Sequence, residues 1–155
     1  MFKVPVDSLA AYLDFDPDRK ADLKRLDKSI RDAAPDLKRH FHAGTLAGEP
    51  GMRFKMIGYG KFHYMASSGE QVAWPVIGIA LQKNYISVYV SATRRGRPLV
   101  ALYAKRLHAL RAGRNNFSFI QFSDLDGDAW SALVTEVGKV FKSDPGNPVR
   151  YWEGN

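Results

Sequence analysis

The sequence predicts a single compact α+β domain in which helices pack against one antiparallel sheet. Three observations lead to this fold class. Apolar residues recur every three or four positions near both ends of the chain, and they alternate with polar residues through the middle. A chain of 155 residues, of which 45% are hydrophobic, is also long enough to bury one core. We therefore expect residues 1–142 to form the domain, in the order α-α-β-β-β-α-β-α, and residues 143–155 to form a flexible tail.

Two helices are expected first. Residues 8–13 fit one short helix, and Asp16 followed by Pro17 predicts the start of a longer one, because Asp favours the N-cap and Pro the first helical position. The longer helix should end at Ala34, since the next residue is a proline, which disfavours helical geometry in the residue before it. Its apolar stripe consists of Leu23, Leu26 and Ile30.

Three strands should follow. Residues 61–67, 72–82 and 85–91 have the composition and alternation that are typical of strands. Gly58-Tyr59-Gly60 predicts a turn or bulge before the first strand, and Lys83-Asn84 predicts a tight hairpin between the other two. The middle strand is apolar on both faces, so we expect it to lie at the centre of the sheet.

A helix, a strand and a helix are expected to close the domain. Pro98 should open a long helix that ends before Gly113, because a glycine commonly follows the last turn of a helix. Residues 117–122 fit the last strand, and Asp126 or Asp128 is expected to cap the final helix. The inward-facing residues expected in the helix after Pro98 are Leu99, Leu102, Tyr103, Leu107 and Leu110.

The middle of the chain is strongly basic. Residues 37–123 hold thirteen Lys and Arg against Glu49 and Glu70, a local net charge of +11 within a total of +7. No acidic residue lies between Glu70 and Asp124. Such a stretch should project a positive field, which favours an anionic partner: a phosphate, a carboxylate, a nucleic acid or an acidic protein surface. Our leading hypothesis is therefore a non-catalytic domain that binds a small anionic ligand or an acidic partner.

Two groups of residues are candidates for the binding site. In the first, three arginines precede the helix expected at Pro98, where free amide groups and the helix dipole favour an anion. In the second, aromatic, His and Lys side chains of the expected strands could line a pocket for a planar anion. The candidate ligand-binding residues are Tyr59, Lys61, His63, Trp74, Lys83, Tyr85, Arg94, Arg95 and Arg97. Both groups also have a structural interpretation, as a solvated loop and as cross-strand packing.

Two other binding functions remain open. Weak binding of single-stranded nucleic acid is one, because a basic centre with stackable aromatics suits it, and Gly58-Tyr59-Gly60 partly matches the RNA-recognition strand motif. Metal binding is the other. His40 and His42 would project to one side of a strand, and His63 could approach them, but no carboxylate adjoins them in sequence. His40 and His42 are therefore weak metal-ligand candidates, and no cofactor is expected.

No catalytic motif accompanies these features. The chain has no Cys, and it lacks the G-x-S-x-G, H-E-x-x-H and P-loop patterns. A catalytic His63 or His108 would need a carboxylate from one of the acidic ends. The sequence therefore favours a protein without enzymatic activity. Because the start lacks an apolar signal region and no apolar run reaches membrane-spanning length, we also expect a soluble cytoplasmic protein.

Several segments resemble the YdhG-like domain family, a bacterial group of unknown function. They are Met56–Tyr64, Ser67–Glu70, Trp74–Gly78, Gln82–Val90, Gly113-Arg114 and Phe117–Phe122, and the resemblance covers nearly the whole chain. It implies a compact α+β fold with helices on one antiparallel sheet, and it implies no established reaction. Some members are described as frataxin-like iron chaperones, which adds iron binding through an acidic surface on the early helices as a further alternative.

Overall fold

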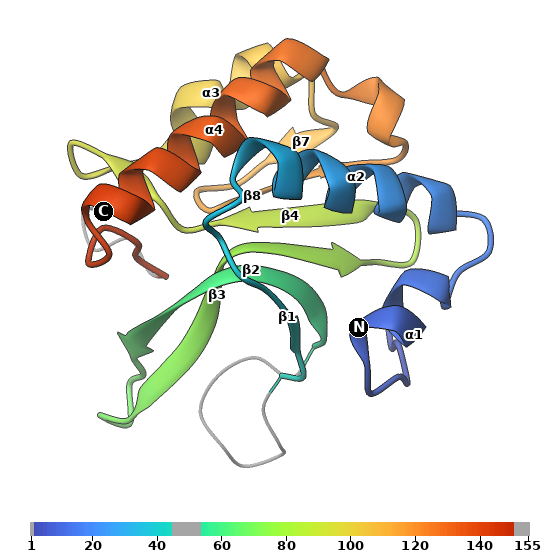
Figure 1. Ribbon diagram of the computed structural model, residues 1–155, viewed down its shortest axis with the longest axis horizontal. Coiled ribbons are helices and arrows are strands. Elements are labelled where there is room, and N and C mark those ends of the chain that lie inside the picture. Colours follow the sequence, from blue (N-terminus) through green and yellow to red (C-terminus); the bar gives the residue numbers. More distant parts are fainter. Residues whose placement is uncertain (1, 45–53, 151–155) are drawn as a thin grey trace.

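The computed structural model describes residues 2–44 and 54–150, and it confirms the α+β fold class (Figure 1). Two helices at the N-terminal end precede a six-stranded antiparallel sheet, and the C-terminal helices pack on that sheet. The helices are α1 (Leu9–Asp14), α2 (Lys20–Ala33), α3 (Leu99–Leu107) and α4 (Gly127–Ser143), and a short 3-10 helix, η1 (Phe122–Asp124), precedes α4.

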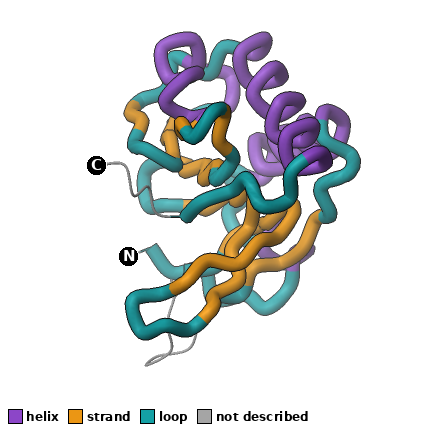
Figure 2. Tube along the Cα trace, turned by 90° about the vertical axis from the view of Figure 1, so that its left-hand side faces the viewer, coloured by secondary structure: helices purple, strands orange, loops and turns teal. Residues whose placement is uncertain are grey.

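The six strands are ordered β1-β2-β3-β4-β8-β7 across the sheet. They are β1 (Arg39–His42), β2 (Met56–Met65), β3 (Gln71–Leu81), β4 (Ile86–Val90), β8 (Asn116–Phe119) and β7 (Arg111–Ala112). A separate two-stranded hairpin pairs β5 (Thr93–Arg94) with β6 (Arg97–Pro98). The expected strand order is thus confirmed for β2, β3, β4 and β8, and the structure adds the two short outer strands β1 and β7. The paired outer ends of β2 and β3 extend away from the helices (Figures 1 and 2).

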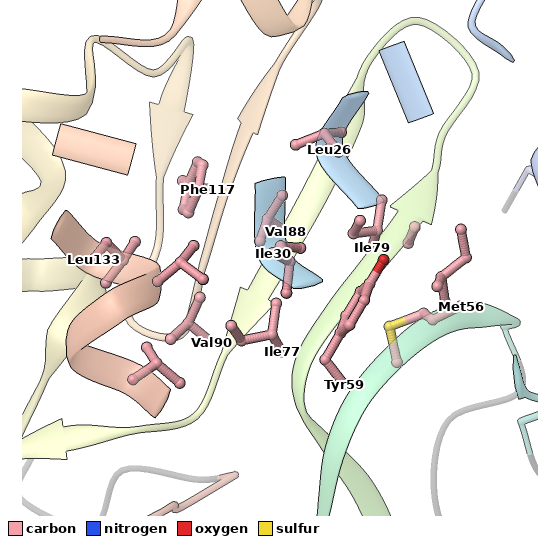
Figure 3. Close-up of a cluster of buried hydrophobic side chains, with 14 of the residues drawn as sticks. Leu26, Ile30, Met56, Tyr59, Ile77, Ile79, Val88, Val90, Phe117 and Leu133 are labelled. Carbon is pink, nitrogen blue, oxygen red and sulfur yellow. The ribbon is translucent and has the colours of Figure 1, made fainter. Parts of the chain in front are cut away.

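The core lies between α2, α4 and one face of the sheet (Figure 3). Leu26 and Ile30 of α2 and Leu133 of α4 point toward strand residues, which include Ile77, Ile79, Val88, Val90 and Phe117. All of these side chains are buried, and each contributes about 1.5–3 kcal/mol to the hydrophobic stabilisation. Because side chains alternate along a strand, the residues between the apolar ones on β4 and β8 face the opposite way. We call that opposite side of β4 and β8 the open face.

A buried carboxylate connects α2 to the first two strands. Asp27 is only 3% exposed, and its Oδ1 accepts a hydrogen bond of 2.6 Å from the hydroxyl of Tyr59. Its Oδ2 accepts a bond of 2.6 Å from Arg39 and lies 3.0 Å from Arg31. Burial and the bond to Asp27 raise the pKa of Tyr59 well above its ordinary value, so the phenol stays protonated and donates. The network therefore fixes α2 against the sheet.

The helix starts agree with the sequence in three of four cases, one of which is α3, which begins directly after Pro98. Ser8 caps α1 and Asp126 caps α4, each by accepting a bond from the backbone three residues later. The start of α2 differs, since the helix begins at Lys20 rather than after Asp16. Asp16 accepts bonds from the backbone N–H of Asp18 at 3.0 Å and from the side chain of Arg19 at 2.6 Å, so it closes a turn instead of capping a helix.

The helix expected to reach Gly113 ends at Leu107. His108 then adopts a left-handed conformation with φ 57°, and the chain continues into β7, which pairs with β8. Gly113 consequently belongs to the turn between these strands, where its N–H donates to the carbonyl of Asn116 at 2.7 Å. Leu110 is 57% exposed, so the prediction that it faces inward is wrong. Pairing with β8 outweighs the local helical pattern because it satisfies backbone groups of both strands.

The last expected strand is shorter than predicted, and β2 is longer. β8 ends at Phe119 instead of at Phe122. Phe122 is the first residue of η1. β2 starts at Met56, so Gly58 and Gly60 lie inside the strand rather than before it. Gly60 has a φ of +70°, and its N–H donates to Lys38 at 2.9 Å instead of joining the ladder with β3. The expected turn or bulge is thus a single-residue distortion inside the strand.

The chain after α4 is held in place as far as the structure describes it. Asn147 donates to the carbonyl of Thr93 at 2.9 Å and accepts from its N–H at 2.7 Å. Val149 donates to the carbonyl of Ser91 at 2.8 Å. Backbone groups just after β4 therefore bind residues 144–150, a contact that the sequence did not indicate, and the flexibility of the tail stays a prediction. Residues 151–155 lie outside the described part of the chain.

Candidate functional site

Two of the expected site residues lie in the interior. Tyr59 is fully buried and donates to Asp27, as described above. Trp74 is 1% exposed and has the rings of His42, Phe54 and Tyr89 around it. These two side chains stabilise the core and have no surface to offer a ligand.

The three arginines of the β5–β6 hairpin do not converge on one point. Arg94 forms a two-pronged ion pair with Glu136 of α4, with N–O distances of 2.7 and 2.5 Å. The hydroxyl of Tyr103 donates to the same carboxylate at 2.7 Å. The bonds from Arg94 hold the pKa of Glu136 below its ordinary value. The carboxylate of Glu136 thus neutralises the guanidinium of Arg94, which was expected to bind the ligand. Arg95 and Arg97 remain exposed at the hairpin.

The two expected lysines lie in separate regions, and His63 shares a strand with Lys61. Lys61 and His63 are exposed on the extended part of β2. Lys61 borders a cavity of about 410 Å³ whose lining also includes His40, His42 and Glu70. Lys83 borders a different cavity of about 480 Å³, whose lining also includes the ion pairs of Asp16 with Arg19 and of Asp22 with Arg25. The nine expected residues are therefore distributed over the molecule rather than gathered into one site.

The histidine pair does lie on a strand, as expected. The ring of His40 covers Gly58, and its Nε2 lies 3.0 Å from the carbonyl oxygen of Gly60. The ring of His42 packs edge-on against Trp74 at 5.3 Å, and its buried Nε2 has no hydrogen-bond partner among the described residues. Within residues 2–44 and 54–150, no three His, Cys, Asp or Glu side chains group closely enough to hold a metal ion.

The burial of His42 should make stability depend on pH. Burial, with smaller effects from the charges of His40 and Lys61, lowers the pKa of His42 to about 4. Since the unfolded chain binds this proton at about pH 6.5, acidification favours unfolding until the folded form is protonated too. Between about pH 7 and about pH 5, the wild type should lose about 2 kcal/mol more of its free energy of unfolding than a His42→Phe variant does.

Urea unfolding at a series of pH values would measure this difference. His63→Phe is the matched control, because it makes the same replacement at an exposed position of the same sheet. Equal acid sensitivity of the wild type and His42→Phe would contradict the prediction.

A pocket that we did not predict lies on the open face. It has a volume of about 390 Å³, and we call it the open-face pocket. The strand register explains its layout, since Ser87 pairs with Ser118 and Ser118 pairs with Arg111, so these three residues form one row across β4, β8 and β7. Tyr89 and Asn116 pair in the next row. The pocket is lined by Gln82, Tyr85, Ser87, Tyr89, Arg111, Ala112, Gly113, Asn116 and Ser118.

Two serine hydroxyls lie at the centre of this lining. The Oγ atoms of Ser87 and Ser118 are 3.0 Å apart, and each residue is 3% exposed. A bond between two hydroxyls uses one of their two protons. Among the described residues no acceptor for the second proton is found, so that proton is available to an oxygen atom of a ligand.

Aromatic and cationic side chains form the walls. The guanidinium of Arg111 lies over the ring of Tyr85, with its central carbon 4.6 Å from the ring centroid. At the other end, burial raises the pKa of Tyr89, while the charge of Arg150 opposes this effect. The carboxamide of Asn116 lies so close to Gly113 that a Cβ there would sit 2.6 Å from its Oδ1. Phenol, carboxamide and guanidinium groups thus surround the serine pair.

Every residue that lines the open-face pocket comes from the acid-free stretch between Glu70 and Asp124. Tyr85 was an expected site residue, and the alternation of Tyr85, Ser87 and Tyr89 with buried aliphatics was a signal that could have indicated the rest of β4. Arg111 was assigned to a helix, which concealed its position opposite Ser118.

In the described ranges neither His63 nor His108 forms an ion pair with a carboxylate, the contact that would orient a catalytic histidine.

Across the part of the chain that the structure describes, no helix combines the length and the apolar character needed to cross a membrane.

Comparison of the chain with protein-family models, with curated proteins and with solved structures finds no match. The resemblance to YdhG-like domains therefore stays a prediction.

Proposed function

We propose that this protein is a non-catalytic binding domain that holds a small anionic molecule in the open-face pocket. The observation that supports this most directly is the buried Ser87–Ser118 hydroxyl pair, with Arg111 in the same row and without an acidic residue in the lining. The site replaces the hairpin arginines of the original hypothesis, since Arg94 is engaged by Glu136.

The chemistry of the lining favours an oxyanion such as a phosphate or carboxylate. Arg111 supplies fixed positive charge and several N–H donors, and the free hydroxyl proton of the serine pair supplies another. The side-chain amides of Gln82 and Asn116 add further donors at the two ends. Hydrogen bonds between charged partners are about twice as strong as neutral ones, so the guanidinium should supply most of the affinity.

A small molecule fits better than an acidic protein surface. The two serines are 3% exposed, so a ligand reaches them only by entering the pocket between Tyr85 and Tyr89. A phosphate or carboxylate group is small enough to do so, whereas the side chains of a folded partner would contact the rim. Iron binding is less well supported, because no cluster of three metal-binding side chains was found in the described residues.

Removal of the guanidinium tests the proposal. Arg111→Gln should weaken the binding of inorganic phosphate about tenfold, because it removes the charged donor. Arg114→Gln is the matched control: it removes the same charge from an exposed position that does not line the pocket, and it should change the dissociation constant by less than about twofold.

Titration with phosphate, followed by amide chemical shifts of ¹⁵N-labelled protein, would measure both constants and locate the site. Shift changes should concentrate at Ser87, Ser118 and Arg111. Equal affinities of the two variants, or shift changes confined to the β5–β6 hairpin, would refute the proposal.

A further inference from the structure

We infer that the anion bound in the open-face pocket is the phosphate of a nucleotide unit, whose base lies against Tyr89 and Asn116. This inference rests on the proposed function and specifies its ligand class. The inference follows from the strand register, which places two kinds of side chain in separate rows of one pocket. One row holds charged and hydroxyl donors, and the next holds an aromatic ring and a carboxamide.

The phosphate end is the row of Ser87, Ser118 and Arg111. Its donors are those that favour an oxyanion, and the stacking of Arg111 on Tyr85 holds the guanidinium over that ring, which also lines the pocket. An arginine stacked on a ring can still donate through the edge of its guanidinium plane. The position of the charge is therefore set before any ligand arrives, which reduces the entropy that binding must overcome.

The base end is the row of Tyr89 and Asn116. Residues two positions apart on a strand are separated by roughly 7 Å, a distance that a mononucleotide spans between its phosphate and its base. The ring of Tyr89 offers a stacking surface, and base–aromatic stacking contributes to the binding of nucleotides of any sequence. A carboxamide has both donor and acceptor atoms, so Asn116 can pair with the edge of a base.

The neighbours of Tyr89 hold the ring in position. Phe54 lies at 5.5 Å in a tilted arrangement, and Trp74 packs edge-on at 5.9 Å, both from the side of β2 and β3. The surface of the ring that remains lines the pocket. The guanidinium of Arg150 lies 4.4 Å from the centroid of Trp74 and adds positive charge behind this wall. A rigid ring loses little conformational entropy when a base stacks on it.

Gly113 leaves space for the second recognition group. A Cβ at this position would lie 2.6 Å from the Oδ1 of Asn116, so only a glycine accommodates the carboxamide in its present place. The absence of a side chain at Gly113 thus leaves room for the carboxamide of Asn116, and both residues line the pocket.

A nucleotide unit has two sources, a free mononucleotide or a single-stranded nucleic acid. The experiment compares four probes on the full chain: inorganic phosphate, ribose 5-phosphate, AMP and a short oligoadenylate. We expect AMP to bind at least about tenfold more tightly than ribose 5-phosphate, because only AMP has a base to stack. An oligoadenylate that binds more tightly than AMP, with an affinity that falls steeply with salt, would identify a strand as the source, and weaker binding would identify the free nucleotide.

Three variants assign the effect to the base end. Tyr89→Leu should remove the preference for AMP over ribose 5-phosphate, because it removes the ring on which the base stacks. Tyr89→Phe should retain the preference, because the stacking ring remains. Asn116→Ala should reduce the preference severalfold, and it keeps the test decisive if Tyr89→Leu fails to fold, since Tyr89 also packs against Phe54.

The outcomes separate this inference from the proposed function. Equal binding of AMP and ribose 5-phosphate, with both weakened by Arg111→Gln, would overturn the nucleotide inference and leave the anion site intact. Absence of binding for all four probes would overturn both. A preference for AMP that persists in Tyr89→Leu and in Asn116→Ala would also overturn the assignment of the base end.

Discussion

Replacement of Asp27 by Ala is expected to lower the free energy of unfolding by about 4 kcal/mol, because it removes the partner of a buried hydroxyl and of two guanidinium groups. The hydroxyl of Tyr59 is fully buried and would lose its acceptor, and unsatisfied buried donors are costly. Arg39 and Arg31 reach solvent and can be hydrated again, so most of the loss comes from Tyr59 and the severed anchor of α2. Urea denaturation monitored by circular dichroism would measure the change.

Asp32→Ala is the matched control for this variant. Asp32 lies on the same helix and forms an ion pair of 2.6 Å with Lys28, which is one helical turn before it. Both of these side chains are more than 60% exposed. An exposed pair of this kind contributes about 0.3–0.5 kcal/mol, so the control should unfold nearly as the wild type does. If Asp27→Ala and Asp32→Ala were equally stable, the buried network would not anchor α2 as we argue.

Replacement of Gly60 by Ala should lower the free energy of unfolding by about 3 kcal/mol, through backbone strain and crowding together. The φ of +70° is one that residues with a side chain adopt at a cost. A Cβ at this position would also lie 3.0 Å from Leu37 and 3.1 Å from Val76, both buried. Thermal and urea unfolding of the variant would measure the effect.

Gly69→Ala separates the contribution of backbone strain from that of crowding. Gly69 has a φ of +86°, yet nothing lies within 4 Å of the Cβ that a substitution would add. Its replacement should therefore show the backbone strain alone, about 1 kcal/mol. A Gly60→Ala variant that is no less stable than Gly69→Ala would show that the packing around β2 can yield without loss.

Local chemistry accounts for the elements that the sequence predicted well. Ser8 and Asp126 cap their helices, and the apolar run of β3 and the alternation of β4 located these strands to within one residue at each end. These signals depend on neighbouring residues in the chain, so they can be evaluated without knowledge of the fold. Asp16 shows the limit, because the same side chain suits a helix cap and an Asx turn equally well.

The site was harder to predict because each candidate depends on a partner that is remote in sequence. Arg94 was expected to bind a ligand, but the fold brings Glu136 to it from α4. Tyr59 was also expected to bind a ligand, but Asp27 of α2 binds its hydroxyl in the core. Conversely, Arg111 becomes a pocket residue only because β7 pairs with β8, which places it beside Ser118.

The sequence by itself determined the fold class, the main strands and the acid-free stretch that lines the open-face pocket, because periodicity, caps and charge are local properties of the chain. Only the tertiary structure decided which of the basic residues are neutralised and which two serines meet. Those outcomes depend on strand register and helix packing, where a shift of one residue would turn Ser87 and Ser118 to the opposite face of the sheet.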